Sequence, residues 1–213
     1  MSSRAEPTPK TLVAAVLALT VTVLGLGGAI VAIKLRPQPV PTTAIDRSIE
    51  LWQRAVIADP ENDDARVGLG MALLEAGRDN DARGAFEEAI GLNGDNWTAL
   101  LQLGLLAAES DAEGAIEYFD RSIAAAPTEN KAIPLVAKGD LLLRQDDAEG
   151  ARIAYEQATV DMPFLLDAHF GLGRALEALG HEKGAMKAYK EALRFDPTNQ
   201  VIAEAIAQLK GED

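Results

Sequence analysis

The sequence predicts an all-α protein: an N-terminal transmembrane helix, then a superhelix of about four and a half repeated helix–turn–helix units with a capping helix. Three observations support this prediction. Residues 11–33 carry no charge, glycines recur every 34 or 35 residues through the rest of the chain, and a helix-breaking Gly or Pro closes each period. With 213 residues, 48% of them hydrophobic, the chain is long enough to bury a continuous core.

The apolar run reads TLVAAVLALTVTVLGLGGAIVAI and covers 23 residues. A helix of this length measures about 34 Å, enough to cross a hydrocarbon core of about 30 Å. We therefore expect an anchor helix over 11–34, after an N-terminal tail of residues 1–10. A secretory signal peptide is the main alternative, but its apolar region usually runs only about 7–15 residues.

The orientation of this anchor depends on the positive charges beside it. The tail offers Arg4, Lys10 and the amino group, and the other flank offers Lys34, Arg36 and the more distant Arg47, so the charges nearly balance. A short tail before such an anchor more often stays in the cytoplasm. We therefore expect a single-pass membrane protein whose C-terminal domain lies on the extracytoplasmic, periplasmic side.

Small residues recur at helical spacing within the run. They are Ala14, Ala18, Thr22, Gly25 and Ala29. Small side chains let helices pack closely in lipid, which favours contact with a membrane partner or a second copy of the chain. The alternative is an Ala-rich anchor without a specific contact.

Residues 35–44 read LRPQPVPTTA and contain three alternating prolines. Such a segment favours an extended polyproline conformation. We interpret it as a semi-rigid spacer before the domain that fills residues 45–213.

A repeat begins after the spacer. Landmark glycines separated by 34, 35 and 34 residues lie in Leu-rich stretches: Gly70, Gly104, Gly139 and Gly173. After each comes a small–aromatic–small motif: Ala82/Phe86/Ala89, Ala115/Phe119/Ser122, Ala151/Tyr155/Ala158 and Ala185/Tyr189/Ala192. A breaker then ends each unit, at Gly94, Pro127, Pro163 and Pro197. Upstream, Ser48/Trp52/Ala55 and Pro60 form the second half of an earlier unit.

This period and these landmarks resemble the tetratricopeptide repeat family, a helix–turn–helix unit stacked into a superhelix. The resemblance covers about residues 45–199. We expect residues 201–210 to form the capping helix that such an array needs. The third unit departs most from the family pattern, because it carries Pro134, Lys138 and a longer preceding loop.

Composition excludes several functions. The net charge of −13 argues against nucleic acid as a partner, because phosphate binding needs a basic surface. The absence of Cys excludes thiolate ligands and nucleophiles, and two His without a ligand cluster make a metal unlikely. No catalytic motif is present: both Gly-Leu-Gly sequences lack the third glycine of a dinucleotide loop. We predict no enzyme activity, no metal and no cofactor.

The resemblance implies peptide binding on the concave face, formed by the first helix of each unit. Positions three before, one after and four after each landmark glycine share one helical face. They are Val67, Met71 and Leu74; Leu101, Leu105 and Ala108; Val136, Asp140 and Leu143; and Phe170, Arg174 and Glu177. We expect a hydrophobic or amphipathic segment of a protein client to bind there, unless these residues pack inside the superhelix instead.

The expected function is that of a membrane-anchored interaction scaffold or assembly factor. The architecture resembles single-span tetratricopeptide proteins that assist secretion or envelope-complex assembly, and repeat domains that present apocytochrome during cytochrome c biogenesis. A permanent structural subunit of a membrane complex is the alternative. Residues 44–213 hold 16 basic and 32 acidic residues, a charge of −16 that serves solubility or favours a basic client.

Overall fold

The computed structural model describes residues 20–24, 30–34 and 43–211, and the chain divides into two compact units between Thr42 and Thr43. In the first unit, strands β1 (Thr20–Leu24) and β2 (Ile30–Lys34) pair in an antiparallel arrangement, with Thr22 opposite Ala32. The expected anchor helix is therefore wrong for these two segments, and its other residues lie outside the described ones. Of the proposed helix-packing residues, Thr22 lies in β1, and Ala14, Ala18, Gly25 and Ala29 fall outside the described residues.

Side-chain shape accounts for this difference. The sequences TVTVL and IVAIK are dominated by β-branched residues, which lose side-chain freedom in a helix and fit a pleated strand well. The hydropathy of the run masks this preference, because apolar strands and apolar helices have similar composition. Among the described residues, no helix is both long enough and apolar enough to cross a membrane.

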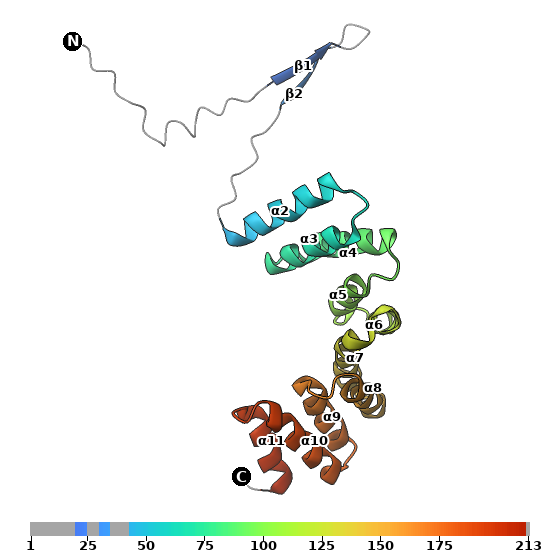
Figure 1. The fold of residues 1–213 in the computed structure, drawn as a ribbon, viewed down its shortest axis with the longest axis vertical. Helices are drawn as coiled ribbons and strands as arrows, with labels where there is room; N and C mark the ends of the chain where they lie inside the picture. The colour runs from blue at the N-terminus through green and yellow to red at the C-terminus, as the bar shows by residue number, and fades with distance from the viewer. Residues whose placement is uncertain (1–19, 25–29, 35–42, 212–213) are drawn as a thin grey trace, which may run out of the picture. The chain divides into compact units, whose positions relative to one another are not determined.

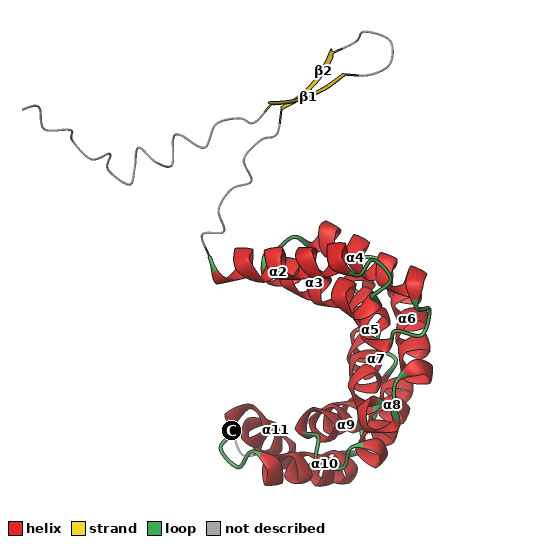
Figure 2. Ribbon diagram, turned by 45° about the horizontal axis from the view of Figure 1, so that its top comes forward, coloured by secondary structure: helices red, strands yellow, loops and turns green. Residues whose placement is uncertain are grey.

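The second unit is all-α. Its described helices are α2 (Ala44–Ala58), α3 (Asp63–Glu75), α4 (Asp79–Leu92), α5 (Trp97–Ala107), α6 (Ala112–Ala125), α7 (Ala132–Arg144), α8 (Ala148–Asp161), α9 (Leu166–Ala178), α10 (Glu182–Phe195) and α11 (Gln200–Lys210) (Figure 1). These bounds confirm four helix pairs, a preceding half unit and a final capping helix. The array forms an arc, with α3, α5, α7 and α9 on its inner side and α4, α6, α8 and α10 on its outer side (Figure 2).

The landmark glycines confirm the predicted register, since each meets the aromatic ring of its own unit. A Cβ at Gly70 would lie 2.5 Å from the Phe86 ring, and one at Gly104 would lie 2.6 Å from Phe119. Gly139 and Gly173 meet Tyr155 and Tyr189 in the same way. All four rings are buried. The missing side chain therefore makes room for the ring that joins the two helices of a unit.

The third unit is the least regular, as the sequence predicts. A short 3-10 helix, η1 (Thr128–Asn130), precedes α7, and among the described residues it is the one helix of that type. Pro134 lies in the first turn of α7, where its missing N–H has no helical partner to lose. Lys138 points to the previous unit and pairs with Asp120 at 2.5 Å.

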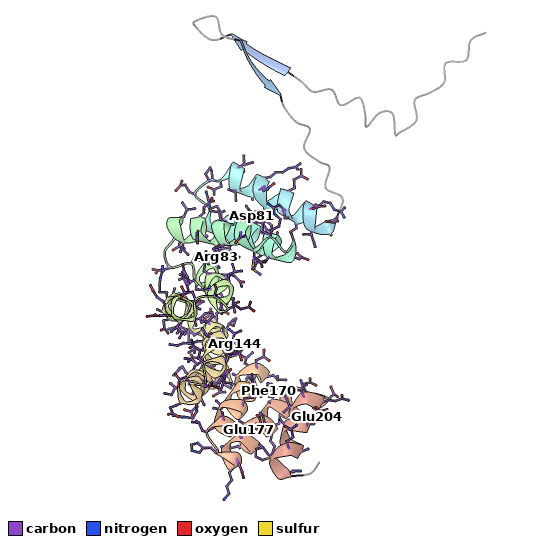
Figure 3. The ribbon with its side chains drawn as sticks, turned by 180° about the vertical axis from the view of Figure 1, so that it is seen from behind. Asp81, Arg83, Arg144, Phe170, Glu177 and Glu204 are labelled. Carbon is purple, nitrogen blue, oxygen red and sulfur yellow. The ribbon has the colours of Figure 1, made fainter. Side chains whose placement is uncertain are left out.

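Polar side chains join neighbouring units. Arg83 of α4, labelled in Figure 3, donates from Nη2 to the Leu106 carbonyl oxygen of α5 at 3.2 Å. Asn96 caps α5 by accepting from the Ala99 N–H at 3.0 Å, and its Nδ2 donates to Asp63 Oδ2 of α3 at 2.8 Å. This second bond is the main cause that lowers the pKa of the Asp63 carboxyl below its usual 3.8.

Asp63→Asn is expected to reduce how much unfolding free energy the protein loses at acidic pH. A lowered folded-state pKa means that the ionised carboxylate contributes stability above the ordinary pKa of 3.8, and that this contribution is lost as the pH falls through the folded-state value. Urea unfolding between about pH 2.5 and 6 should show a shallower loss of unfolding free energy in the variant. Parallel curves for variant and wild type would contradict the assignment.

Candidate functional site

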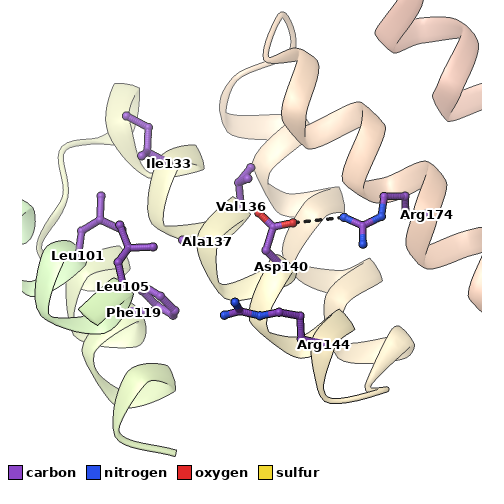
Figure 4. Close-up of a pocket in the computed structure, with 9 residues that line it drawn as sticks. All are labelled: Leu101, Leu105, Phe119, Ile133, Val136, Ala137, Asp140, Arg144 and Arg174. Atoms are coloured by element: carbon purple, nitrogen blue, oxygen red, sulfur yellow. Dashed lines mark ion pairs between the residues drawn. The ribbon is translucent and has the colours of Figure 1, made fainter. Parts of the chain in front are cut away.

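A hollow of about 480 Å³ lies on the inner side of the arc, between α5 and α7 (Figure 4). It is lined by Leu101 and Leu105 of α5, Phe119 of α6, Ile133, Val136, Ala137, Asp140 and Arg144 of α7, and Arg174 of α9. Most of this lining is apolar. The hollow therefore combines side chains from three consecutive units.

The floor and the rim of the hollow differ in accessibility. Leu101 on the floor is only 6% exposed and packs with Phe119 in the core. Leu105 and Ile133 at the rim are 47% and 40% exposed. Two large aliphatic side chains therefore face solvent above a buried apolar floor, which is a surface where a partner side chain can lose contact with water.

Charged groups lie beside this apolar surface. Asp140 and Arg174 form an ion pair at 3.7 Å, the dashed line in Figure 4. Both side chains are about half exposed, so the pair contributes little stability but fixes where the charges lie. The Arg144 side chain forms no hydrogen bond or ion pair with any described residue, and its guanidinium points across the hollow toward Phe119. A partner carboxylate could pair with Arg144 without displacing a group of the chain.

Two tyrosines from the outer helices reach these carboxylates. The Tyr155 hydroxyl of α8 donates to Asp140 Oδ1 at 2.7 Å, and the Tyr189 hydroxyl of α10 donates to Glu177 Oε2 at 2.6 Å. Burial is the main cause that raises the pKa of both phenols above the usual 10.0, and the carboxylate acceptors raise it further. The same rings that fill the glycine gaps thus position acidic groups on the inner face.

Alkaline pH is expected to destabilise the array through these phenols. Because their folded-state pKa is raised, the stability they contribute is present below the ordinary value of 10.0 and is lost as the pH rises above it. Tyr155→Phe combined with Tyr189→Phe should weaken this loss, measured by urea unfolding between about pH 8 and 11. In a Tyr118→Phe background, which leaves these two tyrosines alone, absorbance at 295 nm should show both phenols ionising only as the chain unfolds. Reversible ionisation in the folded protein would contradict the prediction.

The structure gathers about half of the sequence-predicted site residues. Leu101, Leu105, Val136, Asp140 and Arg174 line the hollow, and Met71 and Leu74 line a second one beside α2. The remaining predicted residues line neither hollow. Val67 is buried in the core, Leu143 and Phe170 pack partly buried against core clusters, and Glu177 accepts the Tyr189 bond.

Sequence reasoning missed Ile133, Ala137 and Arg144, which also line the hollow. Ile133 and Ala137 lie three residues before Val136 and Asp140, on the same helical face, but the three positions taken from each unit did not include them. Arg144 lies one turn after Asp140 on the same face, so extending the i, i+4 pattern by one turn would have found it. In the described residues, no group of three or more His, Asp or Glu side chains could hold a metal ion.

The comparisons with known proteins agree with this geometry. A family model described as tetratricopeptide repeat matches residues 45–91, 80–130 and 136–200. The chain belongs to the tetratricopeptide repeat family. This fold is typically a non-catalytic scaffold for protein–protein interaction, and in these general terms the chain is an interaction scaffold.

Individual relatives are more distant. Over 166 residues, the chain is 25% identical to Anaphase-promoting complex subunit 3 of Schizosaccharomyces pombe, an alignment that covers 77% of this chain and 25% of that protein. The solved structure of YrrB, described as a tetratricopeptide protein with an unusual peptide-binding site, superposes with a TM-score of 0.64 at 15% identity, covering 76% of this chain and 84% of YrrB. PilW, described as a type IV pilus biogenesis factor, gives 0.70 at 17%, covering 79% of each chain. Both structures show the shared fold alone.

Proposed function

We propose that this tetratricopeptide protein is a membrane-attached assembly factor whose inner-face hollow binds an apolar or amphipathic segment of a protein client. One observation carries the proposal: Leu105 and Ile133 stand exposed over a buried apolar floor on the concave side of the array. An apolar segment lying in a groove is an established mode of recognition.

The size of the hollow favours weak and reversible binding. Each Leu-sized side chain that a client buries contributes about 1.5–3 kcal/mol, whereas association costs about 4–15 kcal/mol. A few such side chains leave a dissociation constant on the order of micromolar. Arg144 adds orientation, because it favours a client carboxylate on the α7 side of the hollow, beside the Asp140–Arg174 pair.

Two further features support this function. YrrB, which shares the fold, is named for a peptide-binding site, and PilW is named as a type IV pilus biogenesis factor. The uncharged sequence over residues 11–33 supports attachment to a membrane. The short N-terminal tail before it is the reason why we propose that the array lies on the periplasmic side. After alkaline carbonate extraction, the full chain should remain with the membrane fraction. Release into the supernatant would contradict membrane attachment.

A permanent structural subunit is the second candidate. It is favoured by the fission-yeast relative, which is named as a subunit of a complex, although this chain spans only a quarter of its length. The two candidates differ in stoichiometry. A structural subunit should hold one partner at a fixed ratio through detergent extraction, whereas an assembly factor should hold several clients at low occupancy.

Leu105→Asp combined with Ile133→Asp is expected to abolish client capture while the array stays folded, because both side chains are already partly solvated. The matched control is Ile153→Asp with Val160→Asp, two exposed aliphatic residues of the outer helix α8. Affinity purification from solubilised membranes with quantitative mass spectrometry should show at least a tenfold loss for the first pair only. Equal recovery of partners with both pairs, at unchanged helicity, would exclude the inner hollow as the site.

A further inference from the structure

The described residues at the N-terminal end of the array form only the second helix of a unit, α2. In each complete unit, the small–aromatic–small motif of the second helix is buried against the first helix. Helix α2 carries the same motif as Ser48, Trp52 and Ala55, but no first helix precedes it among the described residues. Accordingly, these three side chains are only partly buried, although their counterparts in the complete units are fully buried.

Trp52 shows the vacancy most clearly. On one side its indole packs on Gly68 of α3, where a Cβ would lie 2.5 Å away. Tyr155, its counterpart in the third unit, packs in the same way on Gly171 of the next unit and also fits over Gly139 of its own first helix. Trp52 therefore packs on a glycine of the following unit but not on a glycine of a first helix of its own, since no other described glycine meets its ring.

The position before the aromatic residue gives independent support. It is occupied by Ala85, Ala154 and Ala188 in three of the complete units, and each of these is buried. In α2 it is occupied by Leu51, which is 63% exposed. A large aliphatic side chain therefore faces solvent where the repeat buries a small one.

A second hollow, of about 660 Å³, lies at this place. Its lining comes from the two elements that would flank a missing first helix: Ser48 and Trp52 of α2, and Gly68, Met71, Ala72, Leu74 and Glu75 of α3. The third and fourth units show the same arrangement, because the first helix α7 contacts both its partner α8 and the next first helix α9. The hollow thus lies between the two elements that a first helix would contact in a complete unit.

The chain's own sequence does not favour filling this position from directly upstream. The two helices of a unit are joined by short turns, such as Ala76, Gly77 and Arg78 between α3 and α4. A first helix joined to α2 in this way would fall on about residues 29–41, which include Pro37, Pro39 and Pro41. Each proline in a helix interior costs about 3 kcal/mol, so the helix has to come from elsewhere.

The chemistry of the hollow limits what can enter it. The repeat places glycine opposite every aromatic ring, and Trp52 is larger than Phe or Tyr, so the incoming helix needs glycine at that point. Glu75 is the one charged residue among the described residues that line the hollow. Its carboxylate makes no ion pair or hydrogen bond with any described residue. A basic residue on the incoming helix would pair with it.

We infer that the N-terminal face of the array, formed by Ser48, Leu51, Trp52 and Ala55 of α2 with Met71, Leu74 and Glu75 of α3, binds one amphipathic helix of a partner protein, with glycine facing Trp52 and a basic side chain facing Glu75. The bound helix completes the half unit. This site is separate from the inner hollow at Leu105, so one chain can hold a partner through its end and a client through its groove.

A peptide that copies residues 163–180, a first helix of this chain with its landmark Gly173, is a suitable probe. It is synthesised with a hydrocarbon staple on its solvent-facing side, so that it is already helical, and with a fluorescent label. The full chain carries Trp97→Phe, which leaves Trp52 as its one tryptophan. Labelled-peptide anisotropy should show saturable binding, and Trp52 emission should shift to the blue on saturation, because its free face becomes buried.

Three matched changes make the test specific. A peptide with Leu in place of Gly173 should bind at least about tenfold more weakly, because the added side chain overlaps the indole. Protein carrying Trp52→Ala should bind the glycine peptide more weakly, whereas Leu105→Asp should leave the affinity unchanged. Equal binding of the two peptides, saturation without a Trp52 shift, loss caused by Leu105→Asp, or no saturable binding would each overturn the inference.

Building the helix into the chain itself tests the same site without relying on the affinity of a free peptide. Residues 29–43 are replaced by a copy of residues 63–77, which carries a first helix and its turn directly into α2 and keeps the 16-residue spacing from the landmark glycine to Trp52. The inferred site predicts a higher melting temperature and a blue-shifted Trp52. A melting temperature and an emission maximum equal to those of the parent chain would show that the N-terminal face does not accept a helix.

Discussion

Replacing Gly104 with Leu should cost about 3 kcal/mol or more of unfolding free energy, because the new side chain has to enter a filled core. A Cβ at this position would lie 2.6 Å from the Phe119 ring, which is fully buried in the core. Urea unfolding followed by circular dichroism measures the loss, and the transition should move to lower denaturant concentration.

The matched control is Gly84→Leu. Gly84 lies within α4, and no atom lies within 4 Å of the place where its Cβ would stand. Leu is a better helix former than Gly by up to about 0.8 kcal/mol, so this variant should be as stable as the wild type or more stable. Equal stability of the Gly104 and Gly84 variants would put the repeat register in doubt.

Leu101→Asp should be the second strongly destabilising change, with a loss of about 3 kcal/mol or more. The 6% exposed Leu101 side chain packs in the core with Phe119 and Ala115, so a carboxylate there loses both its hydration and the apolar contacts of the leucine. The change is measured as a fall in melting temperature at neutral pH.

The matched control is Leu105→Asp, on the same helical face as Leu101. It places the charge at the solvated rim and should leave the melting temperature within a few degrees of the wild type. Similar melting temperatures for both variants would show that the floor of the hollow is not part of the core.

Much of the array is predictable because its determinants repeat. The spacing of Gly70, Gly104, Gly139 and Gly173 depends on ring-to-backbone contacts that recur in every unit, and the structure shows each of these contacts. The capping helix and the irregular third unit are predicted for similar reasons, from an apolar period and from Pro134. The N-terminal segment is not predicted correctly where it is described, because hydropathy does not separate an apolar strand from an apolar helix.

The hollow is only partly predictable, because helical spacing shows which way a side chain points but not how deeply it is buried. Val67, Leu101 and Leu105 all fall on the inward face of their helices, yet the first two are buried and the third is 47% exposed. Depth depends on how closely the next first helix approaches, and this approach varies along the array. Ile133 shares the inward face with Val136 and Asp140 by its spacing, but its 40% exposure at the rim does not follow from that spacing.

The most direct test of the inner hollow as the client site is photocrosslinking from intact membranes. A photoreactive amino acid at Leu105 reports on the hollow, and the same residue at Val160 of the outer helix α8 is the matched control, because both positions are exposed aliphatic side chains. The hollow predicts protein adducts from Leu105 that are absent or far weaker from Val160, and that disappear when Ile133→Asp is added. The same adducts from both positions, or adducts from Val160 alone, would contradict client binding in the hollow.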